Sequence, residues 1–276
     1  MTVRRFLVIM VAFGLVVLGW AYWTAIADPI VREADVALAD WPAGAAPVRA
    51  LLMSDLHVAG PDMPPERLAR IVDQANALRP DIVFIAGDFI SDRRVSTRTY
   101  SLAEAVAPLA NLRSHFGTVA VLGNHDHWRD AAEASASLQR IGVRVLDNEA
   151  AEIGPLAVGG LDDAFTHHQD LGAMLNGLRA LPGARVVLSH SPDPFPILSR
   201  DVGFMLAGHT HCGQIRLPLI GALSTMSAYG DRYACGLIRE NGRTLIVSAG
   251  LGTSILPLRL GAAPDMWLIR LGPRTR

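Results

Sequence analysis

The longest apolar stretch of the chain lies at its N-terminus. No charged residue occurs in Phe6–Ala27, and Arg4 and Arg5 stand directly before it. A helix of this length, rising about 1.5 Å per residue, covers the roughly 30 Å hydrocarbon core of a bilayer. The pattern predicts a transmembrane anchor over residues 1–27. The alternatives are a signal peptide cleaved after the small residues at 25–27 and a buried helix of a soluble domain.

The residues that flank this stretch predict its orientation. Trp20, Tyr22 and Trp23 gather at its far end, where aromatic rings favour the membrane interface. Two arginines precede the stretch, whereas acidic residues outnumber the single Arg32 just after it. Because positively charged flanks stay in the cytoplasm, we expect the rest of the chain to lie outside the cytoplasm.

Short apolar runs alternate with amphipathic segments in the rest of the chain. Residues 28–47 are rich in Ala, Asp and Pro and predict a linker, with some helix between Pro29 and Ala39. A single domain is expected over 48–276. Strands are predicted at 48–53, 81–86, 118–122, 185–189, 204–207, 244–248 and 265–271, the last two as antiparallel additions. Helices are predicted at 65–78, 101–112 and 130–141.

This alternation of strands and helices predicts an α/β (α+β) fold. Such an order gives a largely parallel or mixed sheet covered by helices, and the second half of the chain repeats it. We therefore expect a four-layer αββα sandwich of two mixed β-sheets flanked by helices, behind an N-terminal transmembrane helix. Ligands of such sheets bind beyond the carboxyl ends of the strands. Polar residues at those positions are the candidates for chemistry.

Composition narrows the class of protein. Hydrophobic residues make up 50% of the chain and charged residues 18%, which is apolar for a soluble protein. The net charge of −1 gives no basic surface for sequence-independent nucleic-acid binding, so no nucleic-acid partner is expected. Cys212 and Cys235 are too few for a disulfide framework or a structural zinc site. Spacing alone leaves open whether these two cysteines pair.

Oxygen and imidazole side chains follow five of the predicted strands in one direction along the chain. They are Asp55, His57, Asp88, Asn124, His125, Asp126, His190, His209 and His211. Residues two apart on extended backbone point to the same face, so Asp55 pairs with His57 and His209 with His211. Carboxylates can bridge two cations, and imidazoles and an amide complete their shells without excess negative charge. The pattern predicts a dinuclear metal site that hydrolyses phosphate esters.

The series D-x-H, GD, GNH(D/E), H and GHxH resembles that of the calcineurin-like metallophosphoesterases, and every block is present. The later segments GHTHCGQIRLP, SAGLGTSILPLR and APDMWLIRL are similar to a membrane-anchored bacterial subgroup. That subgroup includes UDP-2,3-diacylglucosamine pyrophosphatase-like enzymes of lipid A synthesis. Members of that subgroup often carry the motif GHTHGGQ. In this chain, Cys212 replaces the first of the two adjacent glycines. The resemblance implies a single-pass protein of the bacterial inner membrane.

The resemblance also implies a role for each residue of the series. Residues that would hold a first divalent cation are Asp55, His57, Asp88 and His211. Residues that would hold a second are Asp88, Asn124, His190 and His209, with Asp88 bridging. His125 would face the leaving group as an acid, oriented by Asp126, while a metal-bridging hydroxide attacks in line. Manganese, iron or zinc would suit this mixed set of ligands.

Each residue also has an ordinary interpretation when it is taken alone. An Asp or Asn at a strand-to-helix turn is usually a cap, and Asp126 has this alternative. Trp128 has two, stacking on a base or sugar and packing under its loop. Substrate contacts are considered for His127 and three arginines, with solvated positions as the simpler interpretation for all of them. The arginines are Arg216, Arg232 and Arg259. His167 and His168 are expected in a solvated polar loop, which could also roof the site.

The expected activity is hydrolysis of a phosphodiester or pyrophosphate bond. The anchor makes a lipid-linked substrate such as UDP-2,3-diacylglucosamine a candidate, although that substrate needs a site facing the cytosol. The alternatives are a generic extracytoplasmic phosphodiesterase or phosphatase, a nuclease of the same superfamily, and a metal-binding scaffold without activity. The complete ligand set together with His125 argues against the scaffold.

Overall fold

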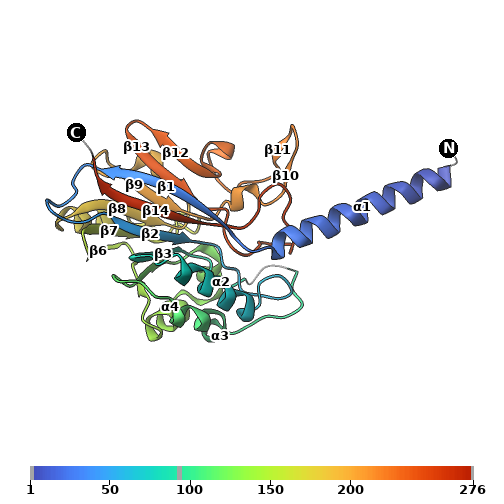
Figure 1. The fold of residues 1–276 in the computed structure, drawn as a ribbon, viewed down its shortest axis with the longest axis horizontal. Helices are drawn as coiled ribbons and strands as arrows, with labels where there is room; N and C mark the ends of the chain where they lie inside the picture. The colour runs from blue at the N-terminus through green and yellow to red at the C-terminus, as the bar shows by residue number, and fades with distance from the viewer. Residues whose placement is uncertain (1–2, 92–94, 275–276) are drawn as a thin grey trace.

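A computed structural model describes residues 3–91 and 95–274 of the chain. Within this part, the strands form two six-stranded mixed sheets and one two-stranded hairpin (Figure 1). The first sheet has the order β1-β14-β2-β3-β4-β5 and the second β12-β13-β9-β8-β7-β6. Apolar side chains of one face of each sheet form the central core between them. The two packed mixed sheets flanked by helices confirm the predicted architecture.

The first sheet and its helices hold most of the first half of the chain. The strands are β1 (Ile30–Leu38), β2 (Val48–Met53), β3 (Ile82–Ala86), β4 (Thr118–Val121), β5 (Arg144–Val145) and β14 (Asp265–Pro273). The helices are α2 (Pro65–Ala77), α3 (Leu102–Val106), the 3-10 helix η1 (Ala107–Asn111) and α4 (Asn124–Arg140). Leu68, Ile71 and Val72 of α2 pack with Leu51 and Val83 of the sheet. These helices therefore cover its outer face.

The second sheet holds the rest of the domain. Its strands are β6 (Glu149–Ile153), β7 (Leu156–Leu161), β8 (Ala184–Ser189), β9 (Phe204–Ala207), β12 (Gly236–Glu240) and β13 (Arg243–Val247). Helix α5 (Leu171–Arg179) covers its outer face through Met174 and Leu178. The hairpin consists of β10 (Arg216–Leu217) and β11 (Gly221–Ala222). Short 3-10 helices are η2 (Phe195–Ile197), η3 (His211–Gly213) and η4 (Gly230–Tyr233).

The expectation of helix between Pro29 and Ala39 was wrong. Residues 30–38 form strand β1, which pairs in parallel with β14 at the edge of the first sheet. Val36 and Leu38 are buried on one face, while the charged residues of the strand remain accessible. The partner strand lies more than two hundred residues away, so local composition gave no sign of it. The two strands at the end of the chain, both predicted to be antiparallel, differ in direction. β14 is antiparallel to β2 as expected, whereas β13 is parallel to β9.

Two predicted helices have different limits in the structure. The segment 101–112 ends its α-helix at Val106 and continues as a 3-10 turn, because Pro108 lacks an N–H and clashes with the preceding turn. Helix α4 begins at Asn124 rather than at residue 130. Its backbone leaves the helical conformation at Asp130, whose carboxylate then accepts the N–H of Glu133. The predicted start therefore corresponds to the second part of α4.

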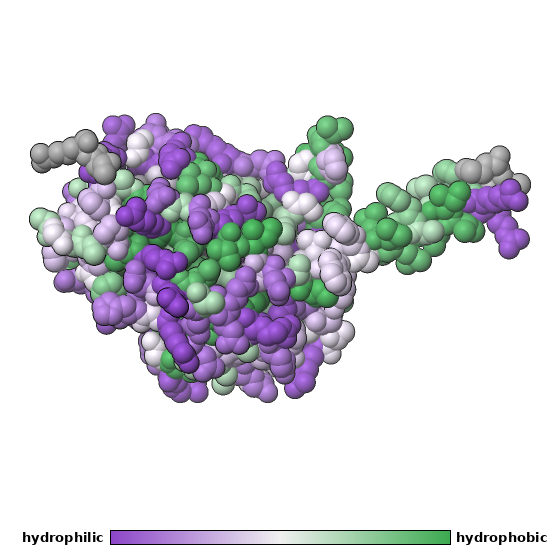
Figure 2. All heavy atoms as spheres, in the orientation of Figure 1, coloured by the Kyte–Doolittle hydropathy of each residue, from purple (hydrophilic) through white to green (hydrophobic). Residues whose placement is uncertain are grey.

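Helix α1 (Val3–Ile26) projects away from the domain (Figures 1 and 2). Only Ala21 and Ala25 of this apolar helix are buried. The Ala21 carbonyl accepts the backbone N–H of Arg259, and the Ala27 carbonyl accepts the side chain of Arg67. This exposure rules out the buried helix of a soluble domain. Figure 2 shows the helix as an apolar rod with polar side chains at its outer end.

Candidate metal centre

The predicted ligands converge at one edge of the two sheets. Asp55 and His57 follow β2, Asp88 follows β3, and Asn124 follows β4. The second sheet contributes His190 after β8 and His209 with His211 after β9. Because β2, β3 and β4 are parallel to one another in the first sheet, and β8 and β9 in the second, the carboxyl ends of the ligand-bearing strands meet at the same edge of each sheet. All seven side chains are buried.

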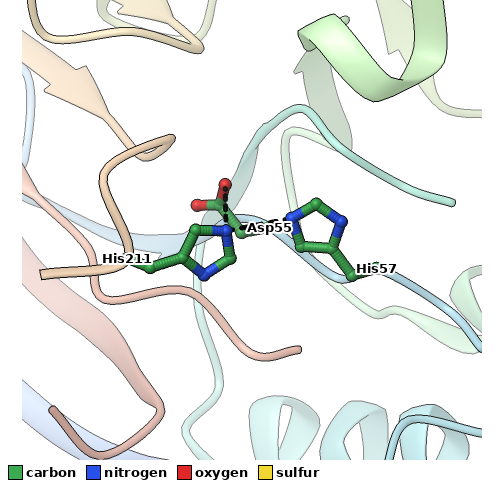
Figure 3. A group of neighbouring side chains, drawn as sticks. All are labelled: Asp55, His57 and His211. Atoms are coloured by element: carbon green, nitrogen blue, oxygen red, sulfur yellow. Dashed lines mark hydrogen bonds and ion pairs between the residues drawn. The ribbon is translucent and has the colours of Figure 1, made fainter. Parts of the chain in front are cut away.

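Asp55, His57 and His211 form the first group of donor atoms (Figure 3). The Nε2 atoms of His57 and His211 lie 3.0 Å apart. Asp55 Oδ1 lies 3.6 Å from Nε2 of His211. Asp88 Oδ2 lies 3.4 Å from Nε2 of His57, so this carboxylate also faces the first group. Four potential ligand atoms therefore surround one position.

Asp88 also faces a second group, with Asn124, His190 and His209. Asp88 Oδ2, the oxygen that faces His57, also lies 3.3 Å from Nε2 of His190. The same His190 nitrogen lies 3.1 Å from Oδ1 of Asn124 and 3.0 Å from Nδ1 of His209. Asp88 thus lies between the two groups, which is the arrangement that a bridging carboxylate requires.

Carbonyl groups fix which nitrogen of two imidazoles carries the proton. Nδ1 of His190 lies 2.7 Å from the Ala86 carbonyl, and Nε2 of His209 lies 3.2 Å from the Met226 carbonyl. Since a carbonyl only accepts, these nitrogens donate, and the other nitrogen of each ring keeps its lone pair for the centre. The chemistry of this donor set fits two divalent cations.

The backbone turns sharply at the ligand positions. Asp55, His57, Asp88, His209 and His211 all have φ between 46° and 71°, in the left-handed region that residues other than glycine adopt uncommonly. Strain of this kind is characteristic of functional sites, where surrounding contacts maintain it. Backbone hydrogen bonds supply those contacts here: the N–H of Asp55 bonds the Gly87 carbonyl, and that of His57 bonds the Asp88 carbonyl.

Two glycines permit the close approach of these loops. A Cβ atom on Gly87 would lie 2.6 Å from the Gly123 nitrogen and 2.9 Å from Nδ1 of His190. A Cβ atom on Gly208 would overlap the Asp55 carboxylate and lie 2.6 Å from Cβ of Ser54. Larger residues would push ligands out of the centre.

Burial and mutual charge shift the pKa values of the ligands in opposite directions. Burial raises the pKa of Asp55 to about 6. Burial also opposes ionisation of Asp88, but His190 and His125 outweigh it and hold the pKa of Asp88 well below its usual range. Burial lowers the pKa of His209 to about 4 and that of His211 well below its usual value. Neutral imidazoles are the form that binds a cation, and these shifts favour that form for His209 and His211. For His190, burial disfavours the charged form, but Asp88 and Asp55 outweigh burial and raise the pKa of the ring.

His125 and Asp126 begin helix α4 beside the centre. The His125 ring contacts the ring of His57 edge-on, with centroids 4.7 Å apart, and its backbone N–H bonds Asp88 Oδ1 at 2.9 Å. The Asp126 carboxylate accepts the backbone N–H groups of Asp88, Phe89 and Gly123, each at 2.9 Å. No described contact joins it to the His125 ring. Asp126 therefore caps the turn and positions Asp88, and its orientation of the His125 ring stays a prediction.

A loop that the sequence analysis took as solvated lies against the second group of ligands. Phe165 contacts the His209 ring at a centroid distance of 4.9 Å and Trp128 at 6.2 Å. His168 stacks on His127 at 4.1 Å, and Nε2 of His127 lies 2.8 Å from Asp162. His167 is exposed. Phe165 was missed because nothing in a polar loop predicts that its one aromatic residue folds back onto a ligand.

The three arginines considered for phosphate binding are held by the protein itself. Arg259 is fully buried, and its guanidinium donates to the carbonyls of Ala249, Gly250, Gly252 and Ala262. It lies 3.3 Å from Nδ1 of His211 and helps to lower the pKa of that ring. Arg216 pairs with Asp231, and Arg232 with Glu240. The surface interpretation of Arg259 was wrong, because its partners are carbonyls from loops distant in sequence.

Cys212 and Cys235 form a disulfide, with Cα atoms 4.7 Å apart. The bond joins the residue directly after the ligand His211 to the start of the strand pair β12–β13. Cys212 has φ 53°, a conformation that glycine adopts more easily. The cysteine that departs from the family pattern is therefore tied to a second loop.

Comparison with known proteins identifies the family. The sequence profile of the calcineurin-like phosphoesterases matches residues 48–213, a span that contains every ligand described above. The chain therefore belongs to the calcineurin-like phosphoesterase family. Together with the clustered Asp and His residues, this membership makes the protein a metal-dependent phosphoesterase.

Relatives share the sequence well beyond the ligand blocks. The chain is 28% identical to an uncharacterized metallophosphoesterase of Helicobacter pylori strain J99, over 96% of this chain and 71% of that protein. It is 31% identical to the metallophosphoesterase YkuE of Bacillus subtilis, over 75% of this chain and 73% of that protein. A Danio rerio protein named transmembrane protein with metallophosphoesterase domain is 27% identical, over 94% of this chain and 59% of that protein.

Proposed function

We propose that this protein is a membrane-anchored, dinuclear-metal phosphodiesterase or pyrophosphatase whose catalytic domain lies outside the cytoplasm. The observation that carries the catalytic part is the position of Asp88. One oxygen of its carboxylate lies 3.4 Å from His57 and 3.3 Å from His190, between two separate groups of buried donors. An aspartate that only stabilises the fold needs a single hydrogen-bond or ion-pair partner. A carboxylate that lies between two groups of imidazoles is instead placed to bind two cations.

The residues of the centre would have separate roles in metal binding and catalysis. Asp55, His57 and His211 would hold one cation, and Asn124, His190 and His209 the other, with Asp88 shared. Bound cations would neutralise charge on the phosphoryl oxygens and make water a better nucleophile near neutral pH. His125 is held beside both groups by its backbone bond to Asp88, which supports its role as the proton donor to the leaving oxygen.

The proposed domain organisation is an anchor over 1–27 and a catalytic domain over 48–276. The segment 28–47, expected as a linker, joins the two and also contributes strand β1 to the first sheet of the domain. The anchor is supported by the exposure of the apolar helix α1 and by the transmembrane relative from Danio rerio. An extracytoplasmic domain is supported by Arg4 and Arg5 before the helix and by the disulfide, since disulfides form in oxidising compartments. In a bacterium, this corresponds to a single-pass protein of the inner membrane.

The arginines before the helix and the disulfide, which support an extracytoplasmic domain, also bear on the substrate. An extracytoplasmic site has no access to a cytosolic nucleotide-linked lipid such as UDP-2,3-diacylglucosamine. A phosphodiester or pyrophosphate that is exposed at the outer surface of the membrane is therefore the substrate class we favour. Phe165 and Trp128 lie beside the second group of ligands and offer an apolar surface for the non-reacting part of such a substrate.

Hydrolysis of bis-p-nitrophenyl phosphate by the full-length protein tests the reaction. We expect turnover with added Mn²⁺, Fe²⁺ or Zn²⁺, its loss on chelation, and a fall of about 10²–10⁴-fold in the His125→Ala variant. The matched control is His115→Ala, because His115 is exposed and precedes β4, at the end of that strand opposite to the ligand Asn124. Wild-type protein that stays inactive with all three metals, or full activity of His125→Ala, would contradict the proposal.

A further inference from the structure

Five large apolar side chains stand exposed on two neighbouring loops of the domain. Leu219, Ile220 and Leu223 belong to the β10–β11 hairpin, and Ile255 and Leu256 to the loop before Arg259. We call these five residues the apolar ledge. Leu219 is fully exposed, and Ile220 and Ile255 are 69% and 63% exposed. Such a patch is uncommon on soluble domains and indicates contact with another surface.

The two loops of the ledge carry no charge. The hairpin sequence has no charged residue between Arg216 and Asp231. The second loop has none from Gly250 to the residue before Arg259. A surface that contacts water or a polar partner normally carries charges among its apolar residues, whereas a surface that contacts hydrocarbon must exclude them. The composition of the ledge therefore favours a lipid surface over a protein partner.

Gln214 joins the two loops into one unit. Its side-chain amide donates to the carbonyls of Ser254 and Leu256, both at 3.1 Å, and its carbonyl accepts the N–H of Ser254 at 2.8 Å. The backbone N–H of Arg216 also bonds the Leu260 carbonyl at 2.7 Å. The ledge thus follows closely after the ligand His211 in the chain, and its loops hold a fixed position relative to each other.

Helix α1 sets the level of the ledge relative to a membrane. The helix has 24 residues, or about 36 Å of length, slightly more than the roughly 30 Å hydrocarbon core. The Arg259 N–H bonds the carbonyl of Ala21 at 2.9 Å, and Ala21 lies only about 7.5 Å along the axis from the end of the helix. Trp20 and Trp23 are exposed at the same level, as expected for the interfacial aromatic belt.

The hairpin extends from the same end of the domain. In Figure 1, β10 and β11 project beside the base of α1, and Figure 2 shows an apolar tip at that place, separate from the apolar helix. The loop of Ile255 and Leu256 leads directly into Arg259, the residue that contacts the helix. Both parts of the ledge are therefore placed where the bilayer surface would lie if α1 spans it.

We propose that the apolar ledge inserts into the outer leaflet of the membrane and forms a second contact beside the helical anchor. This inference rests on the proposed anchor. The segment after the hairpin reaches the metal centre, because the Met226 carbonyl bonds His209 at 3.2 Å. Insertion of the ledge would therefore hold the metal centre at the membrane surface, where a phosphoester of a membrane lipid is within reach and a soluble one is not favoured.

Depth-dependent quenching of a fluorescent label tests the proposal in the full chain. Single Ile220→Cys, Val16→Cys and Ala43→Cys variants are labelled with nitrobenzoxadiazole, which leaves the native cysteines unmodified because they form the disulfide. Each is reconstituted into phosphatidylethanolamine–phosphatidylglycerol vesicles with or without nitroxide lipids. Val16 lies in the middle of α1, and Ala43 is exposed in the loop after β1, at the far end of a nine-residue strand.

We expect nitroxide lipids to reduce the fluorescence at Ile220 and Val16 and to leave Ala43 unchanged. Quenching at Val16 without quenching at Ile220 would overturn the ledge proposal and leave the anchor standing. Unquenched labels at both positions would overturn both. A loss of signal at Ile220 that follows protein density instead of nitroxide content would mean contact between copies of the chain, and would also overturn the proposal. Retained hydrolysis of bis-p-nitrophenyl phosphate verifies that each variant is folded.

Discussion

Single residues set the geometry of the metal centre through the backbone as much as through their side chains. Five of the ligands adopt left-handed backbone conformations, and Gly208 and Gly87 let neighbouring loops approach them. The ligand types are visible in the sequence because carboxylate and imidazole chemistry is restricted to a few residues. The conformations are not, because they follow from hydrogen bonds between loops that are distant in the chain.

Gly208→Ala tests this dependence. The added methyl group would displace the carboxylate of Asp55, so we expect metal affinity and turnover to fall by about 10–100-fold. Metal content by mass spectrometry and hydrolysis of bis-p-nitrophenyl phosphate measure the effect. Gly203→Ala is the matched control, since Gly203 lies at the other end of β9 and nothing lies within 4 Å of a Cβ atom at that position. Equal activity of the two variants would contradict the argument.

At the scale of elements, sequence periodicity located half of the described strands and most of the helices of the domain. It succeeded for β2 (Val48–Met53), which is a short and almost continuous buried run, and for α2 (Pro65–Ala77), whose buried apolar residues follow the helical period. It failed for β1, whose pairing partner β14 is at the other end of the chain. It also missed the role of the loop 162–168, because Phe165 and His168 pack on side chains of other segments.

The attachment of this loop is predicted to depend on pH. Burial disfavours the charged form of His127, but its hydrogen bond to Asp162 and the charges of Asp162, Asp163 and Asp126 outweigh burial and raise the pKa of His127. The folded-state pKa is therefore above that of the unfolded chain. The stabilisation is fully present below the ordinary histidine pKa and is lost as pH rises through the raised value.

Hydrogen exchange by mass spectrometry measures this effect, after correction for the intrinsic rate. We expect amide protection in residues 162–168 to be greater at about pH 6 than at about pH 9, in line with an ordinary histidine pKa of about 6.5. In Asp162→Asn, the dependence on pH should largely disappear. Protection that rises with pH in the wild type would be inconsistent with the ion pair.

At the scale of the whole molecule, Arg259 connects parts that the chain keeps apart. Its side chain bonds the loops after β13 and before β14 and lies beside His211, while its backbone N–H bonds helix α1. Arg259→Met would leave several buried carbonyls without donors, and we expect a loss of about 3–5 kcal/mol of unfolding free energy. Chemical denaturation of the detergent-solubilised protein measures it.

The control for this variant is Arg270→Met, because the Arg270 side chain is 68% exposed. We expect that substitution to change the stability by no more than about 0.5 kcal/mol. Similar losses in the two variants would show that the buried hydrogen bonds of Arg259 do not stabilise the fold.

The disulfide provides a test of orientation. With an extracytoplasmic domain, Cys212 and Cys235 should resist a thiol-reactive reagent in intact, rapidly alkylated cells and react only after reduction. Mass spectrometry of the two peptides measures the labelled fraction. A fully labelled, unreduced protein, together with a C-terminal topology reporter on the cytoplasmic side, would place the domain inside.

By itself, the sequence determined the family, the ligand types, their order and the five strands that carry the ligands. The strands follow from the local periodicity of apolar residues, and the ligands from the fact that few residue types can bind a metal ion. Only the tertiary structure decided the pairing of β1 with β14, the burial of Arg259, the disulfide and the contact of Phe165 with His209. Each of these joins segments that are distant in sequence, and such contacts depend on how the loops pack, which no local pattern records.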